Sequence, residues 1–118
     1  MEDNLLIDIL NVIPAKMECY IQAPSLNNKI ILDMFKKTEY DYYQLLIIDE
    51  TNKNTIVNQE RETSFGIYVQ RIEIKKNGAL LFDGFDGVEF GIVSKNLVIP
   101  EWFKEKYVPE TCMISPNW

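Results

Sequence analysis

The dipeptide Asn77-Gly78 is the feature of this sequence that most restricts how the chain can fold. Both residues tolerate a positive φ angle, which a two-residue turn between antiparallel strands requires. An alternating segment, 72–76, precedes the dipeptide, and an apolar segment, 79–82, follows it. The sequence therefore predicts a tight β-hairpin at this point.

The segments before the hairpin have less uniform patterns. Residues 15–23 alternate between apolar and polar side chains, which is typical of a strand with one buried and one solvent-exposed face. Residues 40–49 are aromatic and β-branched, with a centre that is apolar on both faces, so we expect a strand in the middle of the sheet. Residues 29–37 fit either a short helix or a strand. The polar segment 50–62 predicts an exposed connection.

Two further strands and a turn are expected around the hairpin. In residues 64–76 the apolar positions change parity, so this strand needs a bulge or break near residue 70 to keep them inward. The two Asp-Gly pairs of residues 83–87 predict a second turn, with Phe85 at its exposed tip. Residues 88–93 alternate again and predict another strand.

Helices are expected near both ends of the chain. Apolar residues at helical spacing follow a capping residue at Asp3 or Asn4 and stop at Pro14. Pro100 suits the start of a short helix over 101–107, and the tail beyond it has no regular pattern. We therefore expect one α+β domain over residues 1–118. It should contain a mainly antiparallel sheet of about five strands, an N-terminal helix and a short C-terminal helix.

The sequence has no histidine, which excludes several classes of function. Histidine acid–base catalysis, triads that contain histidine and imidazole metal sites are all ruled out. No glycine-rich phosphate loop occurs, and we expect no cofactor. The longest apolar runs, 45–48 and 79–82, are far shorter than the roughly 20 residues of a membrane-spanning helix. Because the N-terminus is acidic and lacks a secretory signal, we expect a cytoplasmic protein with no membrane partner.

The chain carries 18 acidic and 12 basic residues, a net charge of −6. This balance opposes nucleic-acid binding and favours a basic partner. The acidic excess lies in residues 1–60, which hold 10 acidic and 5 basic residues. The two cysteines are expected to be reduced thiols, with Cys19 buried in its strand and Cys112 exposed in the tail.

Two segments combine carboxylates with aromatic rings and are candidates for binding a partner. Tyrosine joins apolar area to a hydroxyl group, which suits an interface, and neighbouring carboxylates can pair with Lys or Arg. The candidate residues are Glu39, Tyr40, Asp41, Tyr42, Asp83, Phe85, Asp86 and Glu89.

The hypothesis that follows is a noncatalytic acidic protein that occludes a basic macromolecular partner, such as a toxin or nuclease. In size and charge the chain is similar to bacterial immunity proteins, a similarity of profile that covers no motif. A first alternative is a carboxylate-based enzyme or a small-ligand module, with a divalent cation in the loop 83–89. A second is a self-associating subunit joined through a strand edge or through the tail that contains Trp118.

Overall fold

The computed structural model describes residues 3–118 and contains one seven-stranded sheet. The strands are β1 (Met17–Gln22), β2 (Lys36–Lys37), β3 (Gln44–Ile48), β4 (Arg71–Lys76), β5 (Ala79–Phe85), β6 (Phe90–Val93) and β7 (Cys112–Ile114). The helices are α1 (Leu5–Val12), α2 (Lys29–Leu32), α3 (Lys53–Thr63) and α4 (Glu101–Tyr107), with a short 3₁₀ helix, η1 (Phe65–Tyr68).

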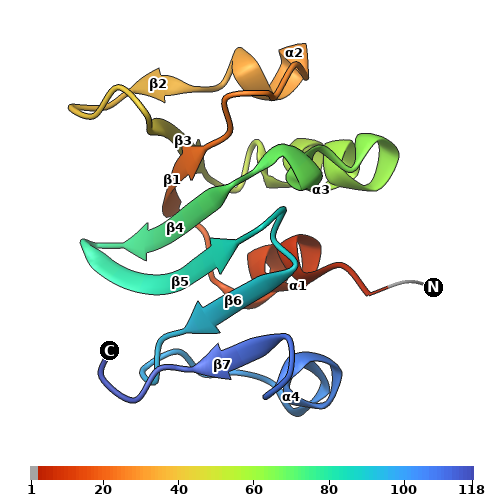
Figure 1. The fold of residues 1–118 in the computed structure, drawn as a ribbon, viewed down its shortest axis with the longest axis vertical. Helices are drawn as coiled ribbons and strands as arrows, with labels where there is room; N and C mark the ends of the chain where they lie inside the picture. Colours follow the sequence, from red (N-terminus) through yellow and green to blue (C-terminus); the bar gives the residue numbers. More distant parts are fainter. Residues whose placement is uncertain (1–2) are drawn as a thin grey trace.

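The strand order is β2-β3-β1-β4-β5-β6-β7 (Figure 1). Every neighbouring pair is antiparallel except β6 and β7, which are parallel. The predicted α+β class is confirmed, with helices towards both ends and a mostly antiparallel sheet. The sheet has seven strands rather than about five.

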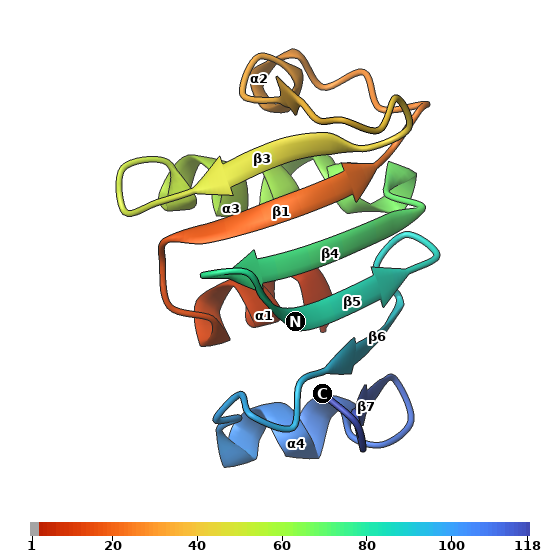
Figure 2. The ribbon, with the colours of Figure 1, turned by 90° about the vertical axis from the view of Figure 1, so that its left-hand side faces the viewer.

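Helices cover only one face of the sheet. In Figure 2 the uncovered face points towards the viewer and α1 and α3 lie behind it. The core fills the space between, where β1 contributes Met17, Cys19 and Ile21 as its alternation predicted. The side chains between them, such as Tyr20, lie on the uncovered face and are half-buried. In the part of the chain that the structure describes, no helix has the length and apolar character that crossing a membrane requires.

The local signals at α1 and at the hairpin predicted the structure correctly. Asn4 caps α1, because its side-chain oxygen accepts a hydrogen bond from the backbone N–H of Ile7 at 2.9 Å. The turn between β4 and β5 has φ angles of 51° at Asn77 and 81° at Gly78. Both values are positive, as this kind of hairpin requires.

The expectation of an exposed connection over residues 50–62 was wrong, because most of this segment is α3. Only Ile56, Val57 and Glu60 of its eleven residues are buried. The carboxylate of Asp49 organises the turn before the helix by accepting hydrogen bonds from the backbone N–H groups of Thr51 and Asn52. The segment 29–37, which fitted either a helix or a strand, contains one of each. Helix α2 comes first and is capped by Asn28, and the short edge strand β2 follows it.

The expected strand over residues 64–76 is correct only from Arg71 onwards. Ser64 ends α3 in a left-handed conformation with φ 52°, and η1 follows directly. The 3₁₀ helix places both Phe65 and Val69 in the core. It therefore keeps apolar residues of this segment inward without the bulge that was expected near residue 70. The irregularity within β4 lies further along, between Ile74 and Lys75.

The turn expected at residues 83–87 begins three residues later, because β5 continues to Phe85. Gly84 belongs to the strand, and it makes room for the ring of Phe82. A Cβ at Gly84 would lie 2.7 Å from that ring, and one at Gly91 on β6 would also clash with it. The β5–β6 turn instead occupies residues 86–89, where Asp86 and Val88 also have positive φ angles.

Two further predictions, one for the C-terminal tail and one for the strand within residues 40–49, were also wrong. The tail contains β7, which pairs with β6 and buries Cys112 completely. The strand within residues 40–49 is second from the edge, because only the two-residue β2 lies outside β3. Cys19 and Cys112 are both free thiols.

Candidate functional site

Several connections that are distant in the sequence meet at one end of the sheet. Strands β1 and β5 end here, and β3, β4 and β6 begin here, because the pairings between them are antiparallel (Figure 2). The start of α1 and the ends of α3 and α4 lie at the same end and line a common cleft. This end is formed by residues 3–4, 23–28, 38–43, 64–70, 86–89 and 108–111.

The segments that form this end of the sheet carry charge of one sign, although two lysines of adjoining elements lie beside them. Lys37 lines a groove with Asp41, and Lys106 is paired with Asp3. The six connecting segments contain six acidic residues and no basic residue, namely Asp3, Glu39, Asp41, Asp86, Glu89 and Glu110. The connections at the opposite end, residues 13–16, 49–52, 77–78 and 94–100, contain two acidic residues, Asp49 and Glu50, and two basic residues, Lys16 and Lys95. We therefore call the first set of segments the acidic end.

Large apolar side chains are exposed beside these carboxylates. Tyr40 and Tyr42 are 51% and 59% exposed, and their ring centroids lie 5.7 Å apart. Ile67, in η1, is 64% exposed. Helix α2 continues the apolar surface, since Leu32 lines a groove with Tyr42. Aromatic and aliphatic groups beside charges of one sign are typical of a surface that binds another protein.

Six of the eight candidate residues lie exposed at the acidic end: Glu39, Tyr40, Asp41, Tyr42, Asp86 and Glu89. The other two, Asp83 and Phe85, belong to β5 and lie on the uncovered face of the sheet. Phe85 is half-buried, so its expected position at an exposed loop tip was wrong.

Asp83 is buried in a two-point ion pair with Arg71. The Nε and Nη2 atoms of Arg71 donate to the two carboxylate oxygens at 3.2 and 3.1 Å. These hydrogen bonds raise the pKa of Arg71. The guanidinium also lies over the ring of Phe85, 5.5 Å from its centroid. Asp83 is therefore already neutralised by a buried ion pair, which makes it a poorer candidate for binding a partner than the exposed carboxylates.

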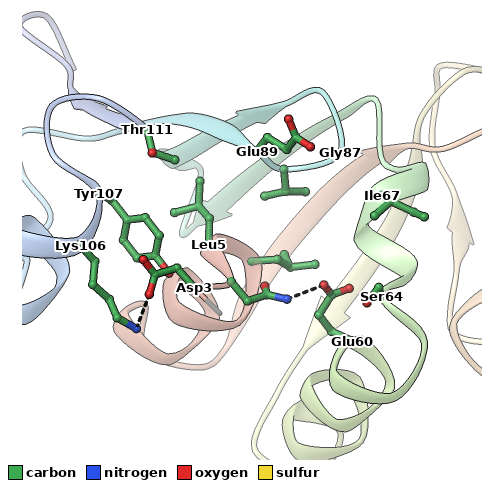
Figure 3. Close-up of a pocket in the computed structure, with 13 residues that line it drawn as sticks. Asp3, Leu5, Glu60, Ser64, Ile67, Gly87, Glu89, Lys106, Tyr107 and Thr111 are labelled. Carbon is green, nitrogen blue, oxygen red and sulfur yellow. Dashed lines mark hydrogen bonds and ion pairs between the residues drawn. The ribbon is translucent and has the colours of Figure 1, made fainter. Parts of the chain in front are cut away.

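A cleft of about 330 Å³ opens at the acidic end, on the helical side of the sheet (Figure 3). It lies between the start of α1, the junction of α3 with η1, the β5–β6 turn and the end of α4. Its polar lining consists of Asp3, Asn4, Glu60, Ser64, Glu89, Lys106, Tyr107 and Thr111.

Glu60 is a buried carboxylate in the wall of this cleft, with an exposed fraction of 5%. One oxygen accepts a hydrogen bond from the side-chain amide of Asn4 at 2.8 Å, and the other accepts from the backbone N–H of Gly66, also at 2.8 Å. Both donors are neutral. A dashed line at Glu60 in Figure 3 marks the first of these bonds.

Among the described residues, Lys106 is the one cation that lines the cleft, and it forms ion pairs at the other side of the cleft. Its ammonium lies 2.9 Å from the carboxylate of Asp8 and 3.5 Å from that of Asp3. The hydrogen bond to Asp8 raises the pKa of Lys106. The hydroxyl of Tyr107 donates to the same carboxylate, and burial together with this bond raises the pKa of Tyr107.

Sequence reasoning missed the cleft residues Glu60, Ser64, Lys106 and Thr111. A signal for Glu60 was present, since Ile56, Val57 and Glu60 are spaced as one face of a helix. Residues 3–118 contain no group of three or more acidic or cysteine side chains placed to hold a metal ion. No protein-family model, curated protein or solved structure matches this chain.

Proposed function

We propose that this chain is a noncatalytic binding protein that docks its acidic end on a basic protein partner and covers the partner's active surface. The observation that supports the proposal most is the coincidence, at one end of the sheet, of six acidic residues with exposed rings such as Tyr40 and Tyr42. Within residues 3–118, only Asp3 among these six has an ion pair. A toxin or nuclease with a positively charged active surface is the class of partner that this chemistry fits. The cytoplasm is the compartment in which we place this function.

The two kinds of group have different parts in the proposed binding. Carboxylates such as Glu39 and Asp41 attract a basic surface over a distance of about one Debye length, roughly 8–10 Å in ordinary salt. They therefore act mainly on the association rate. The tyrosine rings bury apolar area after contact, so they act mainly on the dissociation rate.

The first experiment removes charge at one end of the molecule only. The tagged chain captures its partner from a lysate of the source cells, mass spectrometry identifies the partner, and surface plasmon resonance measures binding of the purified pair. The variant Glu39→Gln/Asp41→Asn is compared with Glu50→Gln/Glu101→Gln, which removes the same charge at the opposite end. We expect the first pair to slow association about threefold to tenfold at low salt and the second to change it much less.

Salt and one apolar substitution complete the test. Association should slow as salt increases, and this dependence should be weaker in Glu39→Gln/Asp41→Asn. Tyr42→Ala should weaken binding about tenfold or more through faster dissociation, whereas Val98→Ala, exposed at the opposite end, should have no effect. Equal effects of the two charge pairs would contradict docking through the acidic end. A partner that is not basic would contradict the proposed chemistry.

A further inference from the structure

We infer that the cleft at the acidic end is a receptor for a single arginine side chain of the partner. This inference rests on the proposed function and names the group that the partner inserts. It starts from the hollow of about 330 Å³ and from the buried charge in its wall, Glu60.

The carboxylate of Glu60 has hydrogen bonds but, among residues 3–118, no ion pair. Its two bonds come from an amide and a backbone N–H, and each oxygen of a carboxylate can accept more than one hydrogen bond. Burial of a carboxylate without a cation is unfavourable, so an inserted cation would find an uncompensated charge. Lys106 does not supply that charge, because its ammonium is bound to Asp8 and Asp3.

The other polar groups of the cleft suit a planar cation with several donors. Glu89 lines the cleft opposite the α3–η1 junction, and the hydroxyls of Ser64 and Thr111 add two acceptors (Figure 3). A guanidinium carries five N–H donors in one plane, whereas an ammonium is a compact and strongly hydrated point charge. The apolar lining, Leu5, Leu6, Ile67 and Val88, suits the aliphatic stem of the same side chain.

Small probes can test this inference without the partner. N-acetyl-arginine amide is titrated into the ¹⁵N-labelled chain, and N-acetyl-citrulline amide, which has the same shape without the charge, is the control. We expect saturable shifts of the backbone amide signals of Gly66 and Gly87, which border the cleft, and no shift of Gly78 at the opposite end. Citrulline should cause no saturable shift, and N-acetyl-lysine amide should bind at least threefold more weakly than arginine.

Two cleft variants assign the effect to the carboxylates. Glu60→Gln should abolish binding of the arginine probe, and Glu89→Gln should weaken it at least threefold, while Glu50→Gln should leave it unchanged. If Glu60→Gln loses the dispersed spectrum of a folded chain, the exposed Glu89→Gln decides the question. Equal shifts with citrulline, shifts that do not saturate, or binding that Glu89→Gln leaves unchanged would overturn the inference.

This test is separable from that of the proposed function. The variant Glu39→Gln/Asp41→Asn alters the tyrosine side of the acidic end and does not touch the cleft lining. If that variant slows association with the partner while the arginine probe does not bind, docking at the acidic end stands and the cleft inference falls. If the probe binds and the variant has no effect on association, the proposed docking surface is wrong instead.

Discussion

The ion pair between Arg71 and Asp83 gives the clearest consequence of changing a single residue. Asp83→Asn would leave the guanidinium of Arg71 without its carboxylate in a site where Asp83 is only 7% exposed. We expect a loss of about 1–3 kcal/mol in the free energy of unfolding, measured by urea denaturation. Asp86→Asn, at an exposed turn position with positive φ, should change it by less than about 0.5 kcal/mol. If the two variants lose equal free energies of unfolding, the ion pair of Asp83 stabilises the fold no more than an exposed carboxylate does.

The two buried thiols predict how stability depends on alkaline pH. Burial raises the pKa of Cys112 from 9.0 to about 11 and also raises that of Cys19. Between pH 9 and pH 11 the unfolded chain would release the Cys112 proton while the folded chain retains it. The contribution of this thiol to the free energy of unfolding is therefore fully present below pH 9 and decreases as pH rises towards 11. In Cys112→Ala the urea midpoint should decline less steeply over this range, and parallel curves would contradict the assignment.

At the scale of elements, α3 can be tested as a helix packed on the sheet. Ile56 is buried against the core at 1% exposure, whereas its neighbour Thr55 faces solvent. Ile56→Ala should lower the free energy of unfolding by about 2–4 kcal/mol, because it leaves a cavity in the core. Thr55→Ala should cause no loss, since alanine has the higher helix propensity. An equally small effect of Ile56→Ala, measured by urea denaturation, would contradict this packing.

The elements that the sequence predicted correctly are those whose signals are local. Asn4 caps its own helix, and Asn77-Gly78 needs only its own φ angles, so both could be identified from a few residues. Helix α3 was missed because only three of its residues face the core, which leaves a mostly polar segment. Gly84 was misassigned to a turn because its place in β5 depends on pairing with Ile72 of β4 and Gly91 of β6, which the Asp-Gly pattern does not indicate.

At the scale of the whole molecule, the order of the strands could not be predicted. Strand β1 lies between β3 and β4, so it separates two strands that follow one another along the chain. That order brings Glu39 and Asp86 to the same end of the sheet, although nothing in the sequence between them indicates it. Six candidate residues therefore lie at one end of the sheet, in two separate connections, whereas Asp83 and Phe85 belong to β5 and lie on its uncovered face.

The C-terminal strand predicts how the molecule responds to shortening. Strand β7 buries Cys112, and the backbone N–H of Ser115 donates to the carbonyl of Val93 at 2.8 Å. A chain that ends at Glu110 should therefore melt at least about 10 °C lower in a circular dichroism scan, or fail to fold. A chain that ends at Ser115 keeps β7 and should lose less. Equal melting temperatures of the shortened and full chains would contradict a structural role for β7.

The acidic end consists of connections, while the strands that hold them are fixed by the core. Substitutions in residues 38–43, or at the exposed positions Asp86 and Glu89, would leave the paired strands β3, β5 and β6 intact. Connections of this kind tolerate change better than buried strands do. Related chains could therefore diverge rapidly at this end and acquire different partners, one connection at a time, while inheriting the same sheet.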